Sequence, residues 1–410
     1  MNYHSSEQRT SWLLIGAAAT VTVVLASLYY QSNETSPTPE KKTPPSKSTR
    51  KPNDCKLSRE KTILIVLSPI EELQEVINNF HGIVVTDLTS IPPLSDKIVY
   101  LCGDIGKATG LIDRDKATRA FILRELSENF EDICLPSWKV VSVGKMPVDI
   151  NGVGVYYRRF FDQETDFFNK IRSQHVFQSL TESNKPGTAH RTGIYLSSVE
   201  KQGEDVRFHL LRCSTNLSGP TGRFQEHDTR VVNALNLEAD VIFENQAPLN
   251  HVLAQIYRNT PGNGHGKKAS KASKAKIKDH ADKTKDMPEN GLMAFVTFYD
   301  QIDLNELQAL DSNGFDYGIF GKKGDAQSAL TKLIFRLKPS VLERDPDCPL
   351  ERNFSITLYP NSVFFMPLST NRLYTHEIKP SHLDVSLIPT RMGYVVRCSD
   401  TEAIHRDGHN

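Results

Sequence analysis

The feature that most constrains the fold of this chain is a set of five polar side chains spread over its last third. His280 and Asp282 stand two positions apart, His376 follows in a later segment, and Arg391 and Arg397 come after it. Two imidazoles and one carboxylate form a donor set that holds Fe(II) on one side and leaves coordination positions open. Residues so far apart in the chain can share one ion only if the fold brings them together.

The local patterns favour strands at each of these positions. Side chains two residues apart on a strand project to the same face, so we expect His280 and Asp282 to point together from one strand. The apolar run 363–366 predicts a strand just before His376, and Arg391 lies on the approach to the strand-like segment 394–396. An arginine in that place can donate two parallel hydrogen bonds to a carboxylate, and Arg397, six positions later, faces the same way.

A His-x-Asp pattern is a weak indication by itself. The chain has 13 histidines, and about one such match is expected by chance. His382 and Asp384 form a second match, and only His405 and His409 follow it, close to the C-terminus and without a later arginine pair. We therefore interpret the second pattern as incidental.

The order and spacing of these stretches resemble the AlkB family of Fe(II)/2-oxoglutarate dioxygenases. Three segments carry the resemblance: an H-x-D-K segment at 280–283, an R-L-x-x-H-x-I segment at 372–378, and an R-x-x-x-x-x-R segment at 391–397. The resemblance implies a set of iron ligands, namely His280, Asp282 and His376. It also implies that Arg391 and Arg397 hold 2-oxoglutarate.

An upstream segment at 253–257 is similar to the family's L-x-N-x-Y strand, with Gln255 where the family has Asn. By resemblance, Gln255 and Tyr257 contact 2-oxoglutarate as well. The likeness covers roughly residues 250–399 and implies a double-stranded β-helix, or jelly roll, that oxidises a substrate C–H bond with dioxygen and releases succinate and CO2.

Two departures from the family pattern affect the prediction. The family's base-reading acidic residue falls two places after the metal-binding Asp, where this chain has Thr284. The long gap between Asp282 and His376 predicts an added element between about 303 and 350.

Three alternatives for function stay open: a nucleic-acid dealkylase, a hydroxylase of proteins or small molecules, and a non-catalytic membrane-tethered scaffold. The sequence identifies neither substrate contacts nor protein partners.

The composition limits the number of domains and the classes of partner that the chain favours. With 410 residues, of which 38% are hydrophobic and 24% charged, the chain has room for two domains beyond a tail. Its formal net charge is zero, so no overall basic excess favours nucleic acid. The six cysteines show no C-x-x-C spacing, which predicts reduced core thiols and not zinc ligands.

The N-terminal part predicts a membrane attachment. After a tail at 1–11, the segment 12–30 has no charged residue and is long enough to cross a bilayer core of about 30 Å. The segment 31–58 is rich in Pro, Ser, Thr and Lys and predicts a flexible stalk. Lysines and arginines after the apolar run favour a cytosolic catalytic part, whereas three glycosylation sequons leave the lumenal side open.

The overall prediction is an α+β chain, with a small α/β domain at 59–147 followed by the oxygenase domain at 148–410. In the first domain, short apolar strands are predicted at 62–67, 82–86, 97–102 and 139–143, and helices at 71–80 and 113–130. Such alternation favours a small parallel or mixed sheet. We interpret this domain as an interaction module, because no phosphate-binding glycine pattern is complete.

The second domain is predicted to be mostly β. Helices are expected at 162–173 and at 229–237 with Asp228 as N-cap, and strands at 193–197, 241–243, 291–299, 330–337 and 354–358. A basic loop at 262–278 carries six lysines from position 267 onward. Because it joins two predicted site strands, it either steers a phosphate-bearing substrate or is only a solvated loop.

Overall fold

The computed structural model describes residues 54–108, 117–131, 137–162, 164–179, 191–211, 217, 221–262, 272–305, 307–309, 317–320 and 326–406. Residues 51–410 form one compact unit that is mixed α/β and mostly sheet. The predicted tail at 1–11, the anchor at 12–30 and most of the stalk at 31–58 lie outside the described residues. Within the described ranges, no helix combines the length and the apolar composition that a membrane crossing requires.

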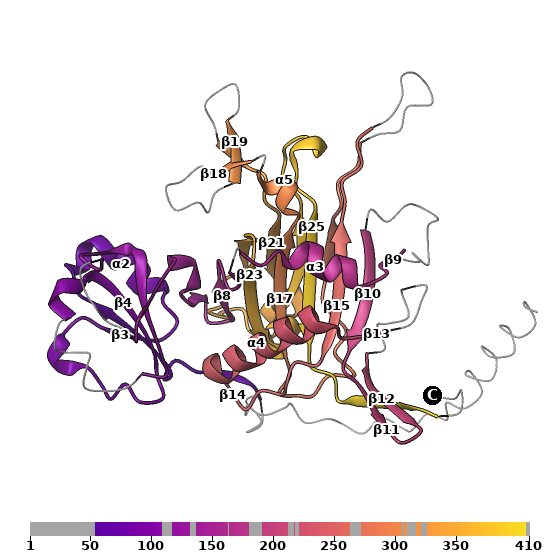
Figure 1. The fold of residues 1–410 in the computed structure, drawn as a ribbon, viewed down its shortest axis with the longest axis horizontal. Helices are drawn as coiled ribbons and strands as arrows, with labels where there is room; N and C mark the ends of the chain where they lie inside the picture. Colours follow the sequence, from indigo (N-terminus) through magenta and orange to yellow (C-terminus); the bar gives the residue numbers. More distant parts are fainter. Residues whose placement is uncertain are drawn as a thin grey trace, which may run out of the picture. The chain divides into compact units, whose positions relative to one another are not determined.

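A parallel five-stranded sheet forms the N-terminal part of the described chain (Figure 1). Its strand order is β3 (Ile83–Val85), β2 (Thr62–Val66), β4 (Ile98–Asp104), β5 (Arg119–Glu128) and β6 (Lys139–Val141). Helix α2 (Ile70–Asn79) connects β2 to β3. Strand β2 is buried along its whole length, as expected when both faces of a parallel sheet are covered.

The helix predicted at 113–130 is wrong for its described part, because residues 119–128 form strand β5. This strand pairs with β4 on one side and β6 on the other, so its backbone hydrogen bonds go to neighbouring strands. Its apolar residues, such as Ala120 and Ile122, are buried at period two. Short apolar spacing fits either period, and the tertiary setting decided between them.

The largest sheet has nine strands in the described part of the chain. Along its main path the order is β13 (Gly222–Arg223), β10 (Arg191–Ser197), β15 (His251–Tyr257), β25 (Arg391–Arg397), β17 (Leu292–Tyr299), β23 (Ser362–Pro367), β8 (Gly154–Tyr157) and β7 (Val148–Ile150), while β9 (Gln178–Ser179) pairs with β10. All pairings are antiparallel except that of β10 with β13.

Two helices cover one face of this sheet (Figure 1). Helix α3 (Phe167–Gln174) begins later than predicted, because Asp166 caps its first turn. Helix α4 (Glu226–Ile242) is longer than predicted at both ends, so residues 241–242 end a helix and do not start a strand. Asp228 is not the N-cap either, because Gln225 takes that position and Asp228 completes the capping box.

A smaller antiparallel sheet faces the other side of the large sheet. Its order is β16 (Ile277–His280), β24 (Tyr374–Lys379), β21 (Lys332–Leu337) and β22 (Asn353–Thr357). One buried cluster contains Phe295 and Phe364 from the large sheet together with Phe335 and Tyr374 from the small one. The two sheets therefore share a core. Helix α7 (Leu368–Leu373) runs directly into β24.

The remaining elements lie around this two-sheet core. The predicted insertion contains α5 (Gln301–Asn305) and a three-stranded sheet of β18 (Gln308–Ala309), β19 (Tyr317–Phe320) and β20 (Ala326–Ser328). Elsewhere there are α6 (Pro339–Arg344), a sheet of β11 (Val199–Gln202), β12 (Asp205–Leu210) and β26 (Thr401–His405), and the pair β1 (Lys56–Leu57) with β14 (Phe243–Glu244). The insertion is shorter than predicted, because β21 belongs to the core.

Candidate metal and anion site

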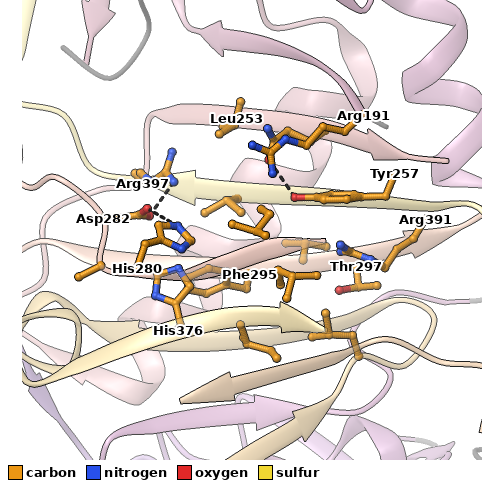
Figure 2. Close-up of a pocket in the computed structure, with 18 of the residues that line it drawn as sticks. Arg191, Leu253, Tyr257, His280, Asp282, Phe295, Thr297, His376, Arg391 and Arg397 are labelled. Carbon is orange, nitrogen blue, oxygen red and sulfur yellow. Dashed lines mark hydrogen bonds and ion pairs between the residues drawn. The ribbon is translucent and has the colours of Figure 1, made fainter. Parts of the chain in front are cut away.

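A cavity of about 420 Å³ lies between the two sheets and contains all seven site residues predicted from the sequence. These are Gln255, Tyr257, His280, Asp282, His376, Arg391 and Arg397. Apolar side chains, among them Leu253, Phe295 and Leu333, form much of the remaining wall. Figure 2 shows the histidines and Asp282 at one end of the cavity, and Tyr257 and Arg391 at the other.

The two histidines meet across neighbouring strands of the small sheet. His280 on β16 stands directly opposite His376 on β24 in the antiparallel register. Directly opposed residues project to the same face, and the two ring centroids lie 4.4 Å apart. His280, Asp282 and His376 each offer a ligand atom, and these atoms lie within 4.8 Å of one another. Three donors at that separation can coordinate a single ion.

Asp282 reaches this cluster in a different way from the one predicted. Strand β16 ends at His280, so Asp282 lies in the loop that follows and strand alternation does not place it. Asn371 on α7 fixes this loop: the Asp282 amide N–H donates to Asn371 Oδ1, and Asn371 Nδ2 donates to the Asp282 carbonyl, both at 3.0 Å. Asn371 is only 3% exposed. It therefore connects the Asp282 loop to the segment that leads into His376.

The Asp282 carboxylate is shared between an arginine and a histidine. Arg397 Nη2 lies 2.7 Å from Asp282 Oδ2, and His280 Nε2 lies 3.5 Å from Asp282 Oδ1. Burial alone would raise the pKa of Asp282, but Arg397 and His280 hold it well below its ordinary value. Asp282 is thus a carboxylate at neutral pH. Arg397 occupies one oxygen, which leaves Oδ1 directed at the histidines.

The two histidines differ in their electrostatic surroundings. Burial lowers the pKa of His376 to about 4, so this ring is neutral at physiological pH and keeps a lone pair for a metal. Burial also acts to lower the pKa of His280, but its contact with Asp282 raises that pKa overall. His376 Nδ1 is buried and has no hydrogen-bond partner among the described residues. The neutral His376 ring, whose buried Nδ1 has no partner among the described residues, and the Asp282 carboxylate together fit a divalent metal ion.

The other end of the cavity has the chemistry of an anion site. Arg391 is 3% exposed, and its guanidinium carbon lies 4.0 Å from the centroid of the Tyr257 ring. In the described part of the chain, neither Nε nor Nη2 of Arg391 has a hydrogen-bond partner, although both atoms are buried. A buried cation without a partner carboxylate is costly, so this end favours an anionic ligand.

Glycine at position 393 makes room for the Arg391 guanidinium. A Cβ atom there would lie 3.0 Å from Arg391 Nη1 and 3.2 Å from Tyr257 Cε2. The Arg391 guanidinium therefore passes over the bare backbone of Gly393 on its way to the Tyr257 ring. Gln255 stands opposite Gly393 in the register, and its Oε1 accepts a hydrogen bond of 2.9 Å from the Tyr257 hydroxyl. Gln255 thus orients Tyr257.

Several features of the site were not predicted. Asn371 had no sequence signal, because its role depends on a contact with a loop 89 positions away. The sequence also did not predict Arg191, which lines the cavity beside Tyr257. The only available signal was its place at the start of a segment with period-two spacing to Tyr195. His251 is fully buried opposite Arg397.

The second His-x-Asp pattern has a structural role. Asp384 Oδ1 accepts hydrogen bonds from the amide and hydroxyl of Ser386 and so caps a short 3-10 helix, Val385–Leu387. Among the described residues, the one cluster with metal-binding geometry is that of His280, Asp282 and His376. His382 does not belong to it.

Comparisons with known proteins add little to this geometry. No protein-family model matches the chain, and no curated protein matches it. Among solved structures, one described as "The structure of OsALKBH1" is similar over 62% of this chain and 99% of that chain, with 12% sequence identity and a TM-score of 0.35. A TM-score of that size supports no conclusion about this chain, so its function is inferred from the site and from the sequence motifs.

Proposed function

We propose that this chain is an Fe(II)/2-oxoglutarate-dependent dioxygenase of the AlkB-like type, with a double-stranded β-helix as its catalytic core. The observation that carries the proposal is the shared cavity: three metal-binding side chains at one end and an unpartnered buried guanidinium at the other. A metal site alone would fit many activities. The pairing with a buried anion site is what favours a co-substrate that is both a chelator and a carboxylate.

The metal end is held by His280, Asp282 and His376. Strand pairing sets the two rings next to each other, with their centroids 4.4 Å apart, and the Asn371 contact holds the Asp282 loop beside them. Arg397 keeps the Asp282 carboxylate ionised through their ion pair. The resemblance implies that Arg397 also holds 2-oxoglutarate. In this proposal Arg397 instead orients the Asp282 carboxylate, because the two are paired at the metal end. The Cα atoms of Arg391 and Arg397 are about 20 Å apart along the strand.

The anion end is held by Arg391 and the aromatic ring beneath it. The Tyr257 ring positions the guanidinium through a cation–π contact, and Gln255 fixes the Tyr257 hydroxyl. The distal carboxylate of 2-oxoglutarate supplies the acceptor that Arg391 lacks. Bound Fe(II) would supply the activation of dioxygen, as 2-oxoglutarate yields succinate and CO2 and one oxygen atom enters a substrate C–H bond.

The primary substrate stays among the alternatives set out from the sequence. Hydroxylation of an N-methyl group on a nucleobase would release formaldehyde. Hydroxylation of a protein side chain or a small molecule at a ring or chain carbon would leave a stable alcohol and release none. Thr284, in the place of an acidic residue, is a feature that favours the second class.

Turnover of 2-oxoglutarate tests the proposal. The full-length chain is incubated with Fe(II), ascorbate and 2-oxoglutarate, with and without methylated oligonucleotides, and succinate and formaldehyde are measured. We expect succinate from the wild type, none from His280→Ala, and wild-type amounts from His382→Ala, which alters the other His-x-Asp pattern. If the wild type neither forms succinate nor binds 2-oxoglutarate in the presence of a metal ion, the proposed function is wrong.

A further inference from the structure

Four neighbouring strands of the large sheet carry an alternating row of arginine and tyrosine. Arg191 on β10 is opposite Tyr257 on β15, Tyr257 is opposite Arg391 on β25, and Arg391 is opposite Tyr299 on β17. Directly opposed residues share a face of a sheet. Arg191, Tyr257 and Arg391 all line the cavity, so two arginines flank one tyrosine at the anion end.

The neighbouring row of residues in the sheet has small side chains where the Arg391 guanidinium crosses it. Gly193, Gln255, Gly393 and Thr297 follow one another across the same four strands. Two of these four residues have no side chain, and Gln255 is turned to the Tyr257 hydroxyl. The bare backbone of Gly393 therefore gives the Arg391 guanidinium room to lie over the sheet, beside the Tyr257 ring.

The charge at this end is not balanced by the protein. Among the described residues that line the cavity, Asp282 is the one carboxylate, and it is already paired with Arg397 at the opposite end. Arg191 Nε is buried without a hydrogen-bond partner within the described chain, as are Nε and Nη2 of Arg391. Two guanidiniums with free buried donors and no facing acid create a need for more than one anionic acceptor atom.

Both guanidiniums can reach one carboxylate. Neighbouring strands lie about 4.8 Å apart, so the backbones of Arg191 and Arg391 are separated by about 10 Å across β15. Figure 2 shows Arg191 pointing toward the Tyr257 side chain, against which Arg391 also packs. A carboxylate has two oxygens with about four acceptor positions, which is enough for two arginines.

We propose that Arg191 is a second binding residue for the distal carboxylate of the co-substrate, and that the Arg191–Arg391 pair makes the site select 2-oxo acids that carry a second carboxylate. This inference rests on the proposed function, since it deepens the description of the same cavity. It assigns to Arg191 a role in specificity, distinct from packing against Tyr257. A residue that only packs would support every 2-oxo acid equally.

Calorimetric binding without turnover tests this role. The full-length protein is loaded with Mn(II) under anaerobic conditions and titrated with 2-oxoglutarate or with 2-oxopentanoate, which has the same carbon chain but lacks the second carboxylate. We expect Arg191→Gln to weaken 2-oxoglutarate binding by about tenfold to a hundredfold, as for a lost charge-assisted contact. Binding of 2-oxopentanoate should change by less than about threefold, and Arg191→Lys should recover part of the loss.

The controls separate the possible failures. Arg59→Gln removes an exposed arginine that pairs with Asp149, and it should bind both ligands as the wild type does. Unchanged 2-oxoglutarate binding in Arg191→Gln would overturn the role of Arg191 and leave the proposed function standing. An equal loss for both ligands would also overturn it, because that result indicates packing. If the metal-loaded wild type binds neither ligand, the proposed function itself fails.

Discussion

Replacing Asn371 by alanine should weaken metal binding although Asn371 is not a metal ligand. The substitution removes both 3.0 Å hydrogen bonds that tie the Asp282 backbone to α7. Each such bond contributes about 1 kcal/mol net. If the loss falls mainly on the metal-bound state, which needs the Asp282 loop in place, about 2 kcal/mol corresponds to roughly a thirtyfold rise in the metal Kd. Loss of a group that orients a ligand typically costs ten- to a hundredfold.

The metal Kd is measured by calorimetric titration of the metal-free full-length protein with Mn(II). The free energy of unfolding is measured separately by urea denaturation. Asn236→Ala is the matched control, because the Asn236 side chain makes the same two hydrogen bonds with the Leu249 backbone, away from the cavity. We expect both variants to lose stability and Asn371→Ala alone to lose metal affinity. Wild-type metal affinity in Asn371→Ala, or an equal loss in Asn236→Ala, would refute the reasoning.

Three further substitutions probe the cavity and its support. Gly393→Val should raise the Kd for 2-oxoglutarate by about tenfold, because a side chain there displaces Arg391 at an overpacking cost of about 1.4 kcal/mol; calorimetry showing no change would exclude this role for the glycine. Burial lowers the pKa of His251 to about 3, so the unfolded chain binds a proton below pH 6.5 that the folded chain does not. The free energy of unfolding should therefore fall by about 2 kcal/mol between pH 7 and pH 5 because of this residue. In urea unfolding, His251→Asn should show a smaller fall than the wild type over the same pH range. An equal fall in the two proteins would contradict the assignment to His251. Asp228→Ala removes a fully buried carboxylate that accepts a 2.8 Å hydrogen bond from the Tyr394 hydroxyl. The substitution should lower the free energy of unfolding by about 2–4 kcal/mol. A loss below about 0.5 kcal/mol would show that this contact does not stabilise β25.

The sequence predicted many strands well because their burial is continuous. The runs at 62–67, 97–102 and 291–299 appear as β2, β4 and β17. Apolar residues without interruption cannot form one stripe of a surface helix, and short lengths between turns favour buried strands. The prediction failed at 119–128, where short apolar spacing fitted a helix as well as a strand. Pairing with β4 and β6 makes this segment a strand.

The sequence by itself determined which chemical groups are present at the site and their order along the chain. His280, Asp282, His376 and Arg391 could be named because their residue types suit a metal and a carboxylate and because their order and spacing resemble those of a known family. Only the tertiary structure decided how those groups are held. Asp282 lies beyond the end of its strand and depends on Asn371, and Arg191 joins the anion end only through the pairing of β10 with β15. Contacts between residues far apart in the chain arise from packing and register, and neither leaves a local pattern in the sequence.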